Sequence, residues 1–241
     1  MNYFDKYQVI GICGGAWGDE GKGKFTDVFA KNADFIVRAQ GGNNAGHTVK
    51  ANGLTLKLHV VPSGIVYENK INIIGNGVVL DIVSIVEKEI KVLKENNINC
   101  NNLKISSDAN VIFPYHNMMD YLRSFKKIGT TAKGIGPCYS DKINRIGLRV
   151  GELYIKSVFE KKLKENIDLY NELFKVYGIN NDVINEFCKQ NPIYKNCFND
   201  LELNYDLLQI VGIFDPFGTK TPDFDFRFLL CIWMKLQNNF Y

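Results

Sequence analysis

A glycine-rich run at residues 14–24, which reads GGAWGDEGKGK, constrains the fold of this chain more than any other feature. The apolar residues 8–13 before it are typical of a buried strand, and residues 24–30 after it have helical spacing. A turn from a strand through glycines into a helix presents backbone N–H groups and the positive end of the helix dipole, and both attract phosphate. The run therefore predicts a phosphate-binding turn.

One position sets this run apart from an ordinary P-loop. Residues 18–24 fit the pattern G-x-x-x-x-G-K, but Phe25 follows where the pattern needs Ser or Thr to hold magnesium. Asp19 offers an alternative hard oxygen ligand, and its carboxylate can also take a proton. The other interpretation is a structural turn with solvated charges. Such a turn does not need lysines, acids and a tryptophan so close together, so we predict a functional loop.

Length and composition favour one large domain, or one domain with a subdomain. The chain has 241 residues, of which 46% are hydrophobic, enough to bury a substantial core. Its formal net charge of +3 is too small to indicate nucleic-acid binding. No apolar stretch approaches the roughly 20 residues of a membrane-spanning helix, and the N-terminus has no signal-peptide pattern. The expectation is a cytoplasmic protein that binds neither nucleic acid nor membrane.

Strand-like and helix-like segments alternate in the first part of the chain. Residues 34–39, 54–61 and 70–74 are typical of strands, the last of them closed by glycines at residues 75–77. Residues 81–96 have the pattern of an amphipathic helix. This alternation predicts an α/β fold with a mostly parallel central sheet, flanking helices and a P-loop-like phosphate site.

The second part of the chain changes character. Residues 129–151 are predicted to be a long, glycine-punctuated basic loop, and residues 152 to about 200 have helical spacing. We interpret residues 1–151 as the α/β core, residues 152–204 as a helical subdomain and residues 205–241 as a tail. One hypothesis for the tail is a non-native origin, from a shifted reading frame or a retained intron.

A second candidate loop lies at residues 43–48, which read NNAGHT. It follows a predicted strand, as the first loop does, so both can project from the carboxyl edge of one parallel sheet. His47 is a candidate acid because its ordinary pKa of about 6.5 allows proton transfer near neutral pH. Gly46 allows the backbone to approach a phosphate or metal closely. For His59 and His116 we expect packed, hydrogen-bonded structural roles instead.

The basic loop at residues 129–151 offers a third set of ligand groups. Thr130 and Thr131 supply hydroxyls, and Arg145 supplies a guanidinium that can bind phosphate oxygens bidentately. This set fits a monophosphate. An exposed basic loop without a ligand is the alternative, and the density of glycines favours binding.

Together these segments resemble the adenylosuccinate synthetase family, the GTP-dependent enzymes that join aspartate to inosine monophosphate (IMP). The resemblance is carried by WGDEGKGK at residues 17–24, NAGHT at 44–48, PSG at 62–64 and GNG at 75–77. It continues with GTT at 129–131, GIGP at 134–137 and RIGLRVG at 145–151. The resemblance covers residues 8 to about 154.

The resemblance implies a mechanism. Asp19 would remove the N1 proton of IMP, so that the O6 atom attacks the γ-phosphate of GTP, which is the co-substrate. His47 would be the acid, and Lys22 would stabilise the phosphates. The implied cofactor is Mg²⁺, held by Asp19 and the Gly46 carbonyl, where it would neutralise phosphate charge.

The resemblance also implies two sets of ligand contacts. The residues implied for GTP are Gly18, Asp19, Glu20, Gly21, Lys22, Gly23, Lys24, Gly46, His47 and Thr48. The residues implied for IMP are Asp19, Glu20, Gly21, Lys22, Asn44, Ala45, Gly46, His47, Thr131 and Arg145. In the family the arginine that matches Arg145 reaches the monophosphate of the neighbouring subunit, which implies a homodimer with shared sites.

The chain departs from the family pattern after about residue 155. It has little more than half the usual family length, and it lacks the Glu-Gly-Ala-Gln-type substrate loop, the arginine-rich segment for aspartate and the Thr-Lys-x-Asp motif for guanine. TKTPD at residues 219–223 has one residue too many for that motif and is interpreted as coincidence. Two hypotheses stay open: a ligase that makes adenylosuccinate, and a truncated, inactive nucleotide-binding protein. A relative acting on deoxyguanylate and an unrelated P-loop GTPase are less favoured alternatives.

Overall fold

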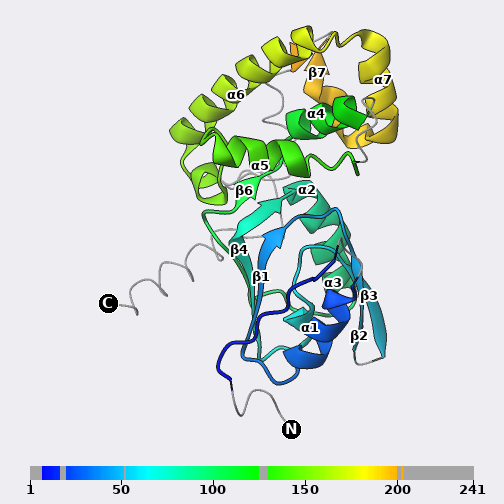
Figure 1. Cartoon of the computed structure of the whole chain (residues 1–241), viewed down its shortest axis with the longest axis vertical. Helices are drawn as coiled ribbons and strands as arrows, with labels where there is room; N and C mark the ends of the chain where they lie inside the picture. Colours follow the sequence, from blue (N-terminus) through cyan, green and yellow to red (C-terminus); the bar gives the residue numbers. More distant parts are fainter. Residues whose placement is uncertain (1–6, 17–19, 52, 125–129, 200–201, 204–241) are drawn as a thin grey trace.

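A short parallel sheet organises the α/β part of the molecule. The computed structural model describes residues 7–16, 20–51, 53–124, 130–199 and 202–203 (Figure 1). The sheet is formed by β1 (Phe35–Gly41), β4 (Ile71–Leu80), β5 (Leu103–Ile105) and β6 (Asn110–Val111). Its order is β1-β4-β5, with β6 also paired to β4, and every pair is parallel. The predicted α/β fold with a mostly parallel sheet is confirmed.

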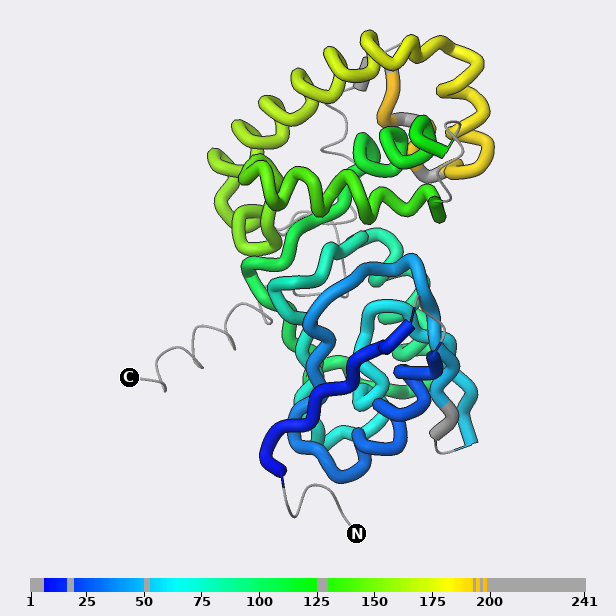
Figure 2. Tube along the Cα trace, viewed as in Figure 1, coloured from blue at the N-terminus to red at the C-terminus, as the bar shows by residue number. Residues whose placement is uncertain are grey.

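The predicted strand at residues 8–13 is wrong. Residues 7–16 contain no strand, and Val9 is 86% exposed. Figure 2 shows this segment as the dark blue end of the trace, running across the surface of the α/β part. A strand needs a partner for its backbone hydrogen bonds, and within the described residues β1 pairs only with β4. Residues 8–13 are therefore apolar in composition but mostly exposed in the structure.

The prediction that the glycines at residues 75–77 close a strand is wrong. They lie inside β4. The pairing of β4 with β1 shifts register there: Arg38 lies opposite Ile74, and Gln40 lies opposite Gly77. A Cβ atom on Gly77 would collide with the carbonyl oxygen of Ala39. The composition of residues 75–77 indicates a turn. In the structure the glycines instead allow β4 to form a bulge and to continue.

Helices and a hairpin cover one side of the sheet. These elements are α1 (Lys22–Ala30), the antiparallel strands β2 (His47–Ala51) and β3 (Leu54–Leu58), and the 3-10 helix η2 (Ser63–Val66). The predicted helix at residues 81–96 is confirmed, and it contains a π-helical turn. Its parts are α2 (Ile82–Ile85), the π-helical turn η3 (Val86–Ile90) and α3 (Lys91–Glu95). The Asp81 carboxylate caps α2 by accepting the Ser84 N–H at 2.9 Å.

A largely helical part lies beside the sheet (Figure 1). Its elements are α4 (Pro114–Ser124), α5 (Ile135–Ile143), η4 (Val150–Tyr154), α6 (Lys156–Val176), α7 (Asn181–Gln190), η5 (Pro192–Cys197), β7 (Phe198–Asn199) and β8 (Glu202–Leu203). The helical character predicted for residues 152–200 is confirmed. None of the helices in the described ranges is both long and apolar enough to cross a membrane.

The predicted loop at residues 129–151 is wrong over its middle, because α5 occupies residues 135–143. Gly134 precedes the helix in the left-handed conformation, with φ at +72°. Pro137 and Cys138 are buried on α5 and supply its apolar contact. The glycines on either side of the helix make this segment resemble a loop in the sequence. The boundary near residue 151 stays a prediction, and the tail at residues 205–241 lies outside the described residues.

The two parts share one hydrophobic core. A single cluster of buried side chains extends from Val49 in the hairpin to Phe198 in β7. A hydroxyl adds a polar connection: Tyr139 on α5 accepts the Gly41 N–H at 2.8 Å and donates to the Gly77 carbonyl at 2.7 Å. The bulge between β1 and β4 is thus completed by a side chain from the helical part.

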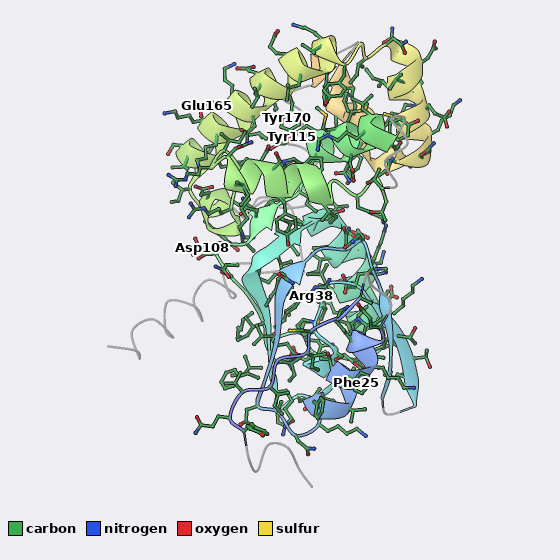
Figure 3. All side chains as sticks on the ribbon, viewed as in Figure 1. Phe25, Arg38, Asp108, Tyr115, Glu165 and Tyr170 are labelled. Atoms are coloured by element: carbon green, nitrogen blue, oxygen red, sulfur yellow. The ribbon has the colours of Figure 1, made fainter. Side chains whose placement is uncertain are left out.

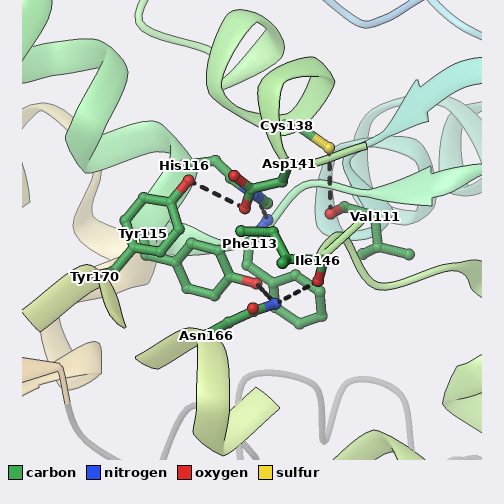
Figure 4. A network of polar contacts seen from close by, with 9 residues as sticks. All are labelled: Val111, Phe113, Tyr115, His116, Cys138, Asp141, Ile146, Asn166 and Tyr170. Carbon is green, nitrogen blue, oxygen red and sulfur yellow. Dashed lines mark hydrogen bonds and ion pairs between the residues drawn. The ribbon is translucent and has the colours of Figure 1, made fainter. Parts of the chain in front are cut away.

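His116 anchors a buried polar network between the helices (Figure 4). Its Nδ1 accepts the Phe113 N–H at 2.9 Å, so the neutral ring carries its proton on Nε2, 3.0 Å from the Asp141 carboxylate. The Tyr170 hydroxyl donates to the same carboxylate at 3.1 Å. Below these groups, Asn166 donates to the Ile146 carbonyl. His116 is fully buried, which confirms its predicted structural role.

We expect His116 to make the stability of the chain sensitive to acid. Burial lowers the pKa of His116, although Asp141 opposes this. A second proton would have to go on Nδ1, which already accepts a backbone N–H. The unfolded chain protonates this residue near its ordinary pKa of about 6.5. The stabilisation is therefore present above that pH and is lost as pH falls towards the lowered folded-state pKa.

The test compares urea unfolding of the parent and His116→Asn at pH 7.5 and pH 5.5. Between these two pH values the parent should lose up to about 1.4 kcal/mol more unfolding free energy than the variant, because pH 5.5 lies one unit below the ordinary pKa. Asn keeps an acceptor near Nδ1 but does not titrate. Equal losses in the two proteins would contradict this role.

Candidate functional site

The glycine-rich loop enters α1 as a bare helix terminus. Gly21 has a φ of +75°, and no side chain among the described residues caps the helix, which begins at Lys22. The Glu20 carboxylate accepts the Ala16 N–H at 3.0 Å and pairs with the Lys22 ammonium group. The first turn of α1 therefore keeps backbone donors for an anion. Gly18 and Asp19 lie outside the described residues.

The structure brings the two predicted loops together. A Cβ atom on Gly23 would lie 2.8 Å from the Cβ atom of His47, so these residues pack against each other. His47 is the first residue of β2 and pairs with Leu58 of β3. The hairpin thus places this imidazole against the first turn of α1. Thr48 follows on the hairpin, where it is exposed.

His47 holds an unused hydrogen-bonding atom. Its Nε2 is buried and has no hydrogen-bond partner among the described residues. Burial lowers the pKa of His47, and the positive charge of Arg38 adds to this effect, whereas Asp27 opposes it. The ring is therefore neutral at pH 7. An unpaired buried nitrogen beside helix donors is available to a ligand.

His59 packs beneath the loop that leads to His47. A Cβ atom on Gly46 would lie 2.7 Å from Cε1 of His59, so only glycine fits over this ring. The packed role predicted for His59 is therefore confirmed. At Nδ1 the predicted hydrogen bond is not found, because this atom is buried without a partner in the described chain.

Glu89 and Arg38 hold this region from below, and sequence reasoning missed both. The Glu89 carboxylate, which is 1% exposed, accepts the N–H groups of His59 at 2.8 Å and of Val60 and Val61 at 3.0 Å. The guanidinium of Arg38 donates to the His59 carbonyl and, at 2.9 Å, to the Gly42 carbonyl. Both loops flanking the hairpin are thus fixed by buried or half-buried charges. Figure 3 labels Arg38 on the sheet.

One signal could have found Glu89. The apolar stripe of residues 81–96 contains Ile82, Ile85 and Leu93, and Glu89 falls in the same stripe. A lone acid on an apolar helix face indicates a buried carboxylate that needs donors. No comparable pattern marks Arg38.

Asn43 anchors the loop before His47. Its Nδ2 donates to the Asp81 carboxylate at 3.1 Å, and burial raises the pKa of Asp81. Asn44 and Ala45 follow and are exposed. The buried asparagine thus fixes the loop, while the next asparagine, which sequence reasoning selected for IMP, is free to meet a ligand.

The loop that carries Thr131 is connected to the same region. Asp120 accepts the Thr130 hydroxyl at 2.7 Å and the Gly134 N–H at 3.0 Å. The next residue, Ile135, packs against Gly42, whose position leaves no room for a Cβ atom. Thr131 itself is exposed.

Arg145 lies apart from these loops. It follows α5 with a left-handed φ of +63°, and its side chain is exposed. Within the described ranges no contact brings it to His47. The structure therefore assembles His47, Gly46 and the start of α1, and leaves Arg145 separate. Its role towards a partner subunit stays a prediction.

Comparisons with known proteins identify a family whose members match most of this chain. The family model for adenylosuccinate synthetase matches residues 11–205. The chain belongs to the adenylosuccinate synthetase family. The resemblance carried by the loop motifs is thereby confirmed.

Relatives of this family are close over the matched region. Adenylosuccinate synthetase from Thermoanaerobacter sp. (strain X514) is 55% identical over 172 residues, covering 69% of this chain and 40% of that protein. The protein of this name from Staphylococcus epidermidis (strain ATCC 12228) is 49% identical over 195 residues, covering 79% of this chain and 43% of that protein. The chain thus spans about two fifths of the length of these relatives.

A solved structure supports the same assignment. The fully ligated adenylosuccinate synthetase from Plasmodium falciparum superposes with a TM-score of 0.61 at 35% sequence identity. The match covers 76% of this chain and 44% of that one.

We expect Gly23→Ala to disturb the contact between α1 and the hairpin. The added Cβ would meet the Cβ of His47 at 2.8 Å, too close for either backbone to remain in place. Overpacking of this kind costs about 1–3 kcal/mol of unfolding free energy, measured by urea denaturation. The pKa of His47, followed by NMR, should rise towards its ordinary value of about 6.5 as the ring is exposed to water.

Gly15→Ala is the matched control, because a Cβ there meets no atom within 4 Å. Its unfolding free energy should stay within about 0.5 kcal/mol of the parent. If the two variants behaved alike, the packing of Gly23 on His47 would not hold this region together.

Proposed function

We propose that this chain carries the phosphoryl-transfer site of an adenylosuccinate synthetase. The reaction is the GTP-dependent ligation of IMP and L-aspartate through 6-phosphoryl-IMP, a step of purine biosynthesis. The observation that carries the proposal is the buried Nε2 of His47, which has no partner among the described residues. The His47 side chain packs beside Gly23 near the start of α1. A phosphate held there would meet the helix donors and the imidazole together.

The proposed chemistry uses three side chains. Asp19 removes the N1 proton of IMP, and the O6 atom then attacks the γ-phosphate of GTP, with GDP as the leaving group. The neutral His47 donates a hydrogen bond to the transferred phosphoryl group. Lys22, on the first turn of α1, offsets negative charge on the phosphates. The amine of aspartate then displaces phosphate from C6.

Magnesium fits this arrangement without a cage of protein ligands. In the described part of the chain no group of three His, Cys, Asp or Glu side chains could hold a metal. Mg²⁺ commonly uses one or two protein oxygens together with water and substrate phosphates. We propose Asp19 and the Gly46 carbonyl as the protein ligands. The ion would supply charge neutralisation at the phosphates.

The remaining contacts complete the proposal. GTP would contact the residues of the first loop together with Gly46, His47 and Thr48. IMP would contact the exposed residues Asn44 and Thr131. Arg145, which is exposed, would reach the monophosphate in a second subunit of a cytoplasmic homodimer.

A second candidate function is nucleotide binding without turnover. The partial coverage of the relatives favours this second candidate, because the chain spans only about two fifths of their length. An assay of adenylosuccinate formation, run beside calorimetric binding of GTP and IMP, separates the two. Binding without product would support this second candidate and contradict the ligase.

Asp19→Asn tests the assigned base. It should lower adenylosuccinate formation at least a hundredfold, since general-base catalysis contributes about 10²–10⁴-fold. Asp34→Asn, a change of an exposed acid before β1, is the matched control and should leave the rate unchanged. A rate in Asp19→Asn close to that of the control would remove Asp19 from the mechanism.

The affinity for GTP should weaken as pH rises. Burial lowers the pKa of His47 in the free protein, and a bound phosphate would raise it again by favouring the charged ring. Binding then takes up a proton between the two pKa values. Each unit of increase in the pKa of the complex strengthens binding at low pH about tenfold.

Titrations of GTP at pH 6 and pH 8 measure this effect. His47→Gln removes the titrating ring, so its difference between the two pH values should be smaller than that of the parent. An unchanged difference would show that the proton goes elsewhere, for example to the nucleotide itself.

A further inference from the structure

Within the described residues, one face of the parallel sheet is only partly covered. The register of β1 with β4 and β5 places Val37, Ile73 and Lys104 side by side, and it places Phe35 beside Ile71. Because alternate residues of a strand point to opposite faces, these five share one face. We call this face, formed by Phe35, Val37, Ile71, Ile73 and Lys104, the bare face.

The opposite face carries the core. Ile36, Ile74 and Leu103 point that way and are buried. Gly64 of η2 packs on Ile36, and α1 in turn contacts η2 and the β2–β3 hairpin. Figure 1 shows α1, α3 and the hairpin gathered on one side of β1 and β4. In the part of the chain that the structure describes, these elements cover this one face of the sheet.

The bare face is apolar and open to solvent. Phe35 is 58% exposed and Val37 is 56% exposed, while Ile71 and Ile73 are only partly covered. Parallel sheets are almost always covered on both faces. A cluster of exposed apolar side chains on such a sheet marks an interaction surface.

The edge of the sheet is incomplete as well. β1 pairs only with β4 in the described chain, so its other edge has no strand beside it. Residues 8–13 have the composition of a buried strand but contain no strand, and Val9 is the most exposed of the large apolar side chains in the described residues. Both observations indicate that the sheet lacks a neighbouring layer.

We propose that the bare face binds the part of an adenylosuccinate synthetase that this chain does not match. That part makes up more than half of the length of the relatives. It is long enough to supply a second layer over Phe35 and Val37. This proposal concerns binding and does not depend on the proposed reaction.

The test uses the full chain and a defined partner. The chain is co-expressed with an affinity-tagged polypeptide that comprises the C-terminal part of the Staphylococcus epidermidis relative beyond the matched region. The expected result is a soluble complex with one copy of each, recovered without nucleotides. Hydrogen exchange should slow over β1 in the complex.

Val37→Lys places a charge on the bare face and should weaken the complex at least tenfold. The matched control is Val176→Lys, at a position that is 83% exposed at the end of α6. Both variants should have the circular dichroism and urea midpoint of the parent, because both side chains already face water.

Three outcomes would overturn the proposal. The first is recovery of the tagged partner without this chain. The second is a homodimer of this chain that Val37→Lys disrupts, which would make a second copy the occupant. The third is equal weakening by Val37→Lys and Val176→Lys. Because only binding is measured, loss of ligase activity alone would leave this proposal standing.

Discussion

The buried carboxylate of Glu89 is the interaction on which the candidate site depends. It accepts three consecutive backbone N–H groups at residues 59–61, where the chain leaves the hairpin. Arg38 supplies the nearby positive charge, and Glu89 in turn favours the charged form of Arg38 against the effect of burial. A buried acid is tolerated only when donors surround it. Its position on the π-helical turn therefore determines where the hairpin, and with it His47, can lie.

The local chemistry of the site could be predicted from the sequence, because it rests on short segments. Glycines before an apolar helix indicate a helix terminus that accepts anions, and Gly-His-Thr after a strand indicates an exposed loop. Parallel-sheet geometry then predicts that the two meet, and Gly23 does pack against His47. His116 could be assigned to the core because a lone histidine outside a polar loop is more often packed than functional, and its ring contacts with Phe113 and Tyr115 agree.

The supports of the site could not be predicted in the same way, because they join residues far apart in the chain. Arg38 and Glu89 meet through the fold, and neither belongs to a motif. Glycine has two meanings that composition does not separate: it ends a strand in one place and permits a bulge in β4 in another. The strand predicted for residues 8–13 is wrong in a different way: their composition is apolar, but in the described structure they pair with no strand and Val9 is exposed.

The hydroxyl of Tyr139 connects the helical part to the sheet. It bonds to backbone groups of β1 and β4 at the bulge, where the two strands are out of register. If the helices were pulled away from the sheet, an amide and a carbonyl would lose their partner in a place where the strands cannot satisfy each other. The helical part therefore supports the sheet at its bulge, and separating the two parts would leave both backbone groups without this partner.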